Sequence, residues 1–135
     1  HRDLHSFPTR RSSDLVGCFM FGVGATDMAA VLATGETWLQ VPETLGVRWH
    51  GQLGLGVCAK DMMLKACAVL GVGGATNRVV EFVGPTIESL PHVERMTLCN
   101  MTAELGAQTG IISPDQITAK YLRSIGTVFD ELTDW

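Results

Sequence analysis

Residues 78–83 form the segment that most constrains the fold of this chain. The stretch RVVEFV is nearly continuously apolar, and its valines and phenylalanine favour extended backbone. A strand of this kind is typical of a sheet that is covered on both of its faces. Helix-forming segments precede and follow it, so the pattern predicts a layered α/β arrangement.

The neighbouring segments support the same fold class. Residues 60–70 combine strong helix formers with an apolar stripe at Met63, Cys67 and Leu70, and glycines end this segment. Ser113 is the expected N-cap of the last helix, and Pro114 its first residue. The other expected helices are 16–24, 26–33, 86–90, 91–105 and 116–123, and the other expected strands are 37–40, 46–50 and 111–112. Strands alternating with helices predict an α/β/α fold over residues 16–135.

Residues 1–15 are expected to stand apart from this domain. HRDLHSFPTRRSSDL resembles one reading frame of a common sequencing-adapter oligonucleotide, and such segments are excluded from fold reasoning. We therefore predict that residues 1–15 are disordered and make no tertiary contacts. The first four residues, HRDL, resemble a kinase catalytic loop, but they do not indicate a kinase because no other kinase motif follows.

Charge and cysteine usage exclude several classes of protein. Without residues 1–15 the chain has seven Lys and Arg against twelve Asp and Glu, a net charge of −5, which argues against nucleic-acid binding. No apolar run reaches the roughly 20 residues of a membrane span. The four cysteines, Cys18, Cys58, Cys67 and Cys99, form no metal-binding pattern and are expected to be free thiols in the cytoplasm.

Residues 95–107 contain the candidate site. Asn100 and Glu104 are four residues apart in an otherwise apolar segment of helical period, so both are expected on one helix face. A carboxylate on such a face is costly unless it has a partner. In the alternative reading, Glu104 is solvated at the edge of the apolar stripe and Asn100 caps the start of a helix.

The run RMTLCNM at 95–101, followed by Glu104 and Gly106, resembles a segment of the aconitase superfamily, most closely its 3-isopropylmalate dehydratase large subunits. The resemblance extends to GIISPD at 110–115, VVEFVG at 79–84, AKD at 59–61, and GVGATDM and VLAT at 22–34. It therefore covers residues 16 to about 122, with several motifs in the same order.

This resemblance implies an internal fragment of a hydro-lyase of leucine biosynthesis that dehydrates and rehydrates a hydroxy di- or tricarboxylate. It implies a [4Fe-4S] cluster in the complete enzyme, whose cysteines lie outside this chain, and a small swivelling subunit as partner. By position, Glu104 would hydrogen-bond the hydroxyl or water at the open iron, and Asn100 would face the cluster. The fragment alone is expected to bind no cluster and to be inactive.

Three alternatives stay open. The fragment could belong to an aconitase or a homoaconitase, or the chain could be a stand-alone α/β binding domain in which Asn100 and Glu104 are structural.

Other motifs are interpreted as structural. The glycine-rich stretches at 22–24 and 71–74 match neither the dinucleotide-binding glycine pattern nor a phosphate-binding loop, and we interpret them as turns. His50 and His92 are read as ordinary residues at the ends of elements. Asn100 and Glu104 are further expected to border a concavity.

Overall fold

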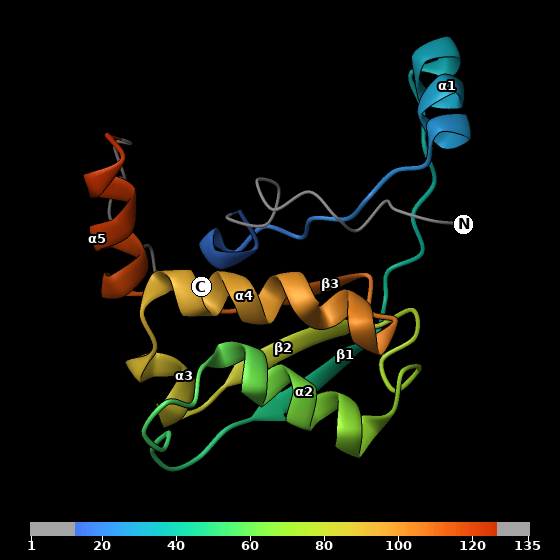
Figure 1. The fold of residues 1–135 in the computed structure, drawn as a ribbon. Coiled ribbons are helices and arrows are strands. Elements are labelled where there is room, and N and C mark those ends of the chain that lie inside the picture. The colour runs from blue at the N-terminus through green and yellow to red at the C-terminus, as the bar shows by residue number, and fades with distance from the viewer. Residues whose placement is uncertain (1–12, 127–135) are drawn as a thin grey trace.

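Three parallel strands in the order β1-β2-β3 form the sheet at the centre of the molecule. The computed structural model describes residues 13–126. Its strands are β1 (Thr44–Arg48), β2 (Val79–Val83) and β3 (Thr109–Ile111). All three begin at one edge of the sheet, the amino edge, and end at the other, the carboxyl edge (Figure 1). The α/β class is confirmed, with the predicted strand 79–83 in the middle.

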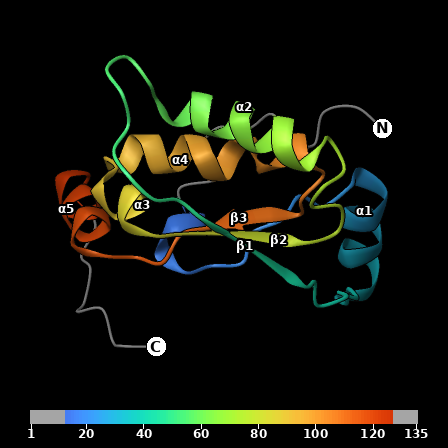
Figure 2. The same cartoon turned by 90° about the horizontal axis from the view of Figure 1, so that it is seen from below.

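Helices α2 (Ala59–Leu70) and α4 (His92–Met101) lie on the same side of the sheet (Figure 2). A Cβ atom on Gly110 of β3 would lie only 2.9 Å from the Cα atom of Cys99, so α4 passes directly over that strand. Val80 pairs with Gly110 in the register, and Val80 and Phe82 therefore face the same helices. Both are at most 2% exposed, and with Met63 and Leu98 they form the apolar core.

The start of the described chain corrects one prediction. The 3-10 turn η2 (Ser13–Val16) contacts β3 and α4, and Leu15 is completely buried in the core cluster. The expected absence of tertiary contacts in residues 1–15 is therefore wrong at Leu15, because its apolar side chain fills space beside β3. Residues 1–12 lie outside the described residues.

The segment between η2 and β1 also differs from expectation. No helix spans 16–24, where Gly17 has a φ of +78°, and the expected strand at 37–40 has no sheet partner. Helix α1 (Ala25–Thr34) is present, but none of its residues is buried. β1 begins at Thr44 and not at Gly46, because the amide of Val79 donates to the carbonyl of Glu43 at 2.9 Å and starts the ladder there.

The C-terminal half follows the predicted order with different helix ends. Helix α3 (Pro85–Ser89) follows β2, and α5 (Gln116–Ser124) follows β3. The expected helix 91–105 is divided, because α4 ends at Met101 and a 3-10 turn, η3 (Thr102–Leu105), continues the chain. Asp115, and not Ser113, is the N-cap of α5, and it accepts hydrogen bonds from the amides of Ile117 and Thr118.

Candidate active site

Asn100 and Glu104 both lie near the amino edge of the sheet, but not on one helix. Asn100 is in the last turn of α4, whereas Glu104 is on η3, which leads into β3. The Asn100 side chain is half-buried, and its Oδ1 atom is buried without a hydrogen-bond partner. Glu104 is exposed. Asn100 therefore does not cap a helix start, and Glu104 is solvated, as one alternative reading expected.

Two buried residues hold the turn that carries Glu104. Thr102 is 0% exposed, and its Oγ1 atom donates to the carbonyl of Cys99 at 2.7 Å. Leu105 is also 0% exposed and belongs to the apolar core. Glu104 lies between these two anchors, so its backbone is fixed while its carboxylate points out of the core.

A cavity of about 770 Å³ opens at the amino edge. Sequence reasoning did not single out its charged residues, which are Asp27, Glu43 and Arg78. Arg78 pairs with Glu43 at 3.4 Å, and their side chains are 45% and 82% exposed. Asp27 stands in the first turn of α1, and Arg78 directly precedes β2. Neither Asn100 nor Glu104 lines this cavity, and the concavity expected around them stays a prediction.

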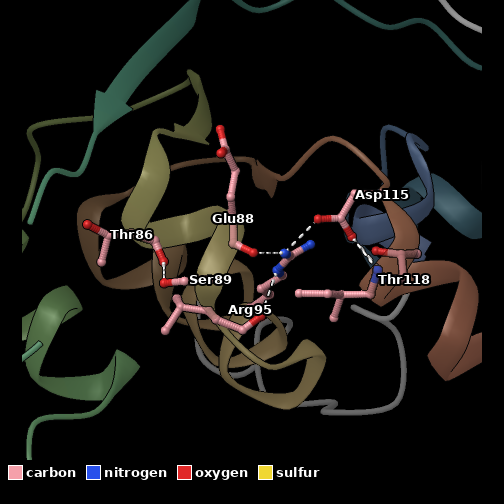
Figure 3. A network of polar contacts seen from close by, with 8 residues as sticks. Thr86, Glu88, Ser89, Arg95, Asp115 and Thr118 are labelled. Atoms are coloured by element: carbon pink, nitrogen blue, oxygen red, sulfur yellow. Dashed lines mark hydrogen bonds and ion pairs between the residues drawn. The ribbon is translucent and has the colours of Figure 1, made fainter. Parts of the chain in front are cut away.

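A polar network at the carboxyl edge joins two of the motifs that carried the resemblance. The Arg95 side chain, 1% exposed, donates to the carboxylate of Asp115 at 2.7 Å (Figure 3). It also donates to the carbonyls of Glu88 at 2.9 Å and Leu90 at 3.1 Å. Arg95 thereby ties α3, α4 and the start of α5 together, and its charge is neutralised within the chain.

The same network sets the ionisation of Asp115. Burial acts to raise the pKa of this carboxyl, but three effects outweigh it: the hydrogen bond from Arg95, the amides of Thr118 and Ile117, and the Arg95 charge. The pKa therefore lies below its usual value, and Asp115 stays ionised at neutral pH. A charged carboxylate that accepts hydrogen bonds from Arg95 and from two amides of α5 holds these segments together.

His92 lies beside this network. Its ring stacks on that of Tyr121 in α5 at a centroid distance of 4.0 Å, and it is 5% exposed. Both ring nitrogens are buried without a hydrogen-bond partner. Burial and then the charge of Arg95 lower the pKa of His92, against a smaller opposing effect of Asp115. His92 is thus a neutral packing residue, whereas His50, two residues after the end of β1, is exposed as expected.

The cysteines are dispersed. None of the four, which all lie within residues 13–126, is in a disulfide; Cys18 and Cys58 are exposed, Cys67 is half-buried and Cys99 is buried. Among residues 13–126, no three His, Cys, Asp or Glu side chains form a group that could hold a metal ion. Over the same residues, no helix has the length and apolar character needed to cross a membrane.

Comparisons with known proteins give a consistent result. The model of the aconitase family (aconitate hydratase) matches residues 11–134. The chain is 45% identical over 108 residues to the "3-isopropylmalate dehydratase large subunit 1" of Methanopyrus kandleri. This alignment covers 80% of the chain and 26% of that protein.

Two further relatives are similarly close. The chain is 49% identical over 108 residues to the "Probable methanogen homoaconitase large subunit" of Methanothermobacter thermautotrophicus, covering 80% of the chain and 25% of that protein. It is 47% identical over 109 residues to the "3-isopropylmalate dehydratase large subunit" of Halothermothrix orenii, and this alignment covers 81% of the chain and 26% of that protein. The chain therefore spans about a quarter of the length of these relatives.

Proposed function

Since the chain belongs to the aconitase family, we propose that it forms part of the large subunit of a [4Fe-4S] hydro-lyase. The reaction is the dehydration and rehydration of a hydroxy di- or tricarboxylate, with 3-isopropylmalate as the first candidate substrate. Relatives that are named as large subunits support a small subunit as partner. A cytoplasmic enzyme of leucine biosynthesis fits this proposal.

The residues that the structure describes fit a role beside the cluster. The described cysteines form no metal-binding group, so thiolate ligands would come from other parts of the complete enzyme. The buried, unpartnered Oδ1 atom of Asn100 marks a side-chain amide that has no partner within the described fold. The Asn100 side chain as a whole is only half-buried, which leaves part of it open to a group supplied from outside the segment, as expected for a residue next to a cluster.

One observation carries the proposal: a half-buried amide side chain with an unpartnered oxygen and a solvent-facing carboxylate stand close in sequence near the amino edge, inside the matched family segment. When bound, the cluster supplies an open iron that acts as a Lewis acid toward substrate oxygens. Glu104 would hydrogen-bond the hydroxyl group and donate a proton to it as it leaves as water, and would take a proton from the water that adds in rehydration. Asn100 would orient the groups next to the cluster.

The test is Glu104→Gln in the full-length large subunit, assembled with its small subunit and loaded with the cluster. We expect kcat to fall by about 10²- to 10⁴-fold, because glutamine keeps the shape of the side chain but cannot exchange the proton. Glu88→Gln is the matched control, since its exposed carboxylate lies at the carboxyl edge and only its backbone carbonyl is used. An unchanged rate for Glu104→Gln would exclude the catalytic role.

Asn100→Ala should act more mildly than Glu104→Gln. We expect a smaller loss of rate together with a more loosely held or more readily oxidised cluster, read by its absorption spectrum. If cluster content and rate both match those of the unaltered enzyme, Asn100 is not a neighbour of the cluster.

Homoaconitase is the second candidate, and the 49% identity to a probable methanogen homoaconitase supports it. Steady-state kinetics of the full-length enzyme with (2S)-2-isopropylmalate, homocitrate and citrate distinguish the two candidates and aconitase. The substrate with the highest kcat/KM identifies the reaction.

A further inference from the structure

The loop before β2 runs beside the turn that carries Glu104. The amide of Ala75 donates to the carbonyl of Leu105 at 3.0 Å, and the amide of Asn77 donates to the carbonyl of Gly106 at 3.3 Å. In the reverse direction, the amide of Gln108 donates to the carbonyl of Arg78 at 2.9 Å. Residues 73–78, here called the clamp loop, thus form a short main-chain ladder with residues 105–108.

The ladder supplies hydrogen-bond donors that the η3 turn lacks. A four-residue 3-10 turn has few hydrogen bonds of its own, and the carbonyls at its C-terminal end lack intrahelical partners. The clamp loop supplies a donor for the carbonyl of Leu105, the last residue of η3, and one for Gly106 directly after it. Ala75 and Leu105 are both 0% exposed, so this contact is shielded from water.

Glycine is required on both sides of the contact. Gly106 has a φ of +75°, and a Cβ atom there would lie 3.0 Å from the Oγ1 atom of Thr76. Thr76 cannot easily retreat, because that oxygen donates to the carbonyl of Gly73 at 2.8 Å. A Cβ atom on Gly74 would lie 2.5 Å from the carbonyl oxygen of Leu70 at the end of α2.

We propose that the clamp loop positions Glu104 for catalysis, with Gly106 and Gly74 as positioning residues. This inference rests on the proposed function, because it assumes that Glu104 acts on the substrate. Glu104 is two residues before Gly106, so any displacement of Gly106 away from Thr76 moves the backbone that sets the direction of the carboxylate. The glycines act through Glu104 and need not touch the substrate themselves.

The test is Gly106→Ala in the full-length, cluster-loaded enzyme with its small subunit. We expect a loss of kcat on the order of 10²-fold, which is typical of a catalytic group displaced by about 1 Å, and little change in KM. Amide hydrogen exchange of the cluster-free protein should show faster exchange at Ala75, Asn77 and Gln108. Adding Thr76→Ala removes the opposing oxygen and should restore part of the rate.

The matched control is Gly35→Ala. Gly35 follows α1 as Gly106 follows η3, and its φ and ψ of 72° and 7° resemble the 75° and 11° of Gly106. No atom lies within 4 Å of a Cβ at Gly35, so the control reproduces the backbone strain without a push on a neighbour. Its kcat and its exchange at Ala75 and Asn77 should equal those of the unaltered enzyme.

The outcomes separate this inference from the proposed function. A slow Glu104→Gln enzyme combined with a Gly106→Ala enzyme as fast as Gly35→Ala overturns the positioning role alone. A Glu104→Gln enzyme at full rate overturns the proposed role of Glu104 and this inference with it. If Gly106→Ala yields no folded protein, Thr76→Ala replaces it, with a smaller loss of kcat and faster exchange at Asn77 expected.

Discussion

The two edges of the sheet differ in where their charged groups lie. At the carboxyl edge, Arg95 is buried and its charge is met by Asp115 and by backbone carbonyls. Near the amino edge, Asn100 has a buried oxygen with no partner and Glu104 faces solvent. A buried polar group is normally satisfied within its own protein. The His92 ring nitrogens at the carboxyl edge are unpartnered too, so the two edges differ in their charged groups and not in orphaned polar atoms. The comparison teaches that a buried, paired charge holds the fold at the first edge, whereas the second edge leaves its charge in solvent.

Asp115→Ala should give the largest loss of stability, because it leaves the buried charge of Arg95 without its counter-ion. Breaking a buried pair typically costs about 3–5 kcal/mol, and we expect about 3 kcal/mol because the Asp115 side chain is 36% exposed. Asp115→Asn keeps an acceptor for the α5 amides and should lose less. Urea unfolding measures both variants; equal stability of Asp115→Ala and the unaltered protein would refute the structural role of this edge.

Gly110→Ala should disturb the connection between the sheet and the candidate site. A Cβ atom there would lie 2.6 Å from the Cγ2 atom of Thr102 and 2.9 Å from the Cα atom of Cys99. Such overpacking typically lowers the free energy of unfolding by about 1–3 kcal/mol. Gly46→Ala is the control on β1, where no atom lies within 4 Å of the added Cβ. Similar urea midpoints for both variants would contradict the close packing of α4 on β3.

Acid should weaken the carboxyl edge in two separate pH ranges. Because the pKa of His92 is lowered in the folded protein, the unfolded chain takes up the proton first, and stability falls as the pH drops below about 6.5. The pKa of Asp115 is also lowered in the folded protein. Its contribution to stability is therefore complete above about pH 3.9, and it is lost as the pH falls through the pKa that Asp115 has in the folded protein.

His92→Phe tests the upper of these ranges. Phenylalanine can stack on Tyr121 and does not titrate, so the loss of stability between pH 7 and pH 5 should become smaller. Arg95, Asp115 and Tyr121 are the ionisable groups around His92, and none of them is altered. His50→Gln, at an exposed position, should keep the original pH dependence. An unchanged slope for His92→Phe in unfolding curves would show that another group is responsible.

The smallest effect is expected at the rim of the amino-edge cavity. Arg78→Gln breaks the pair with Glu43, in which both partners are exposed. Exposed pairs contribute about 0.2–1 kcal/mol, and salt screens them. The urea midpoint should therefore hardly move, and the difference should shrink further in high salt. A loss as large as that of Asp115→Ala would remove the contrast between the two edges.

Local sequence patterns determined most of the regular elements. The apolar run at 79–83, the helix formers at 60–70 and the glycines after them predicted β2 and α2 almost to the residue, because propensity, periodicity and burial all favour the same structure there. The family resemblance of residues 16 to 122 also came from the order of short motifs alone. The same reasoning failed at 16–24 and 37–40, where glycine-rich or β-favouring segments find no partner in the described fold.

Only the tertiary structure decided how the polar residues are partnered. Helical period placed Asn100 and Glu104 on one face, but α4 ends at Met101 and the following 3-10 turn is hydrogen-bonded to the clamp loop. Arg95 and Asp115 are 20 residues apart, and no local pattern predicts that they meet. Leu15 is buried because β3 and α4 offer it an apolar space. Periodicity reports the neighbours of a residue along the chain, whereas ionic partners and caps depend on which distant segments the folded sheet brings together.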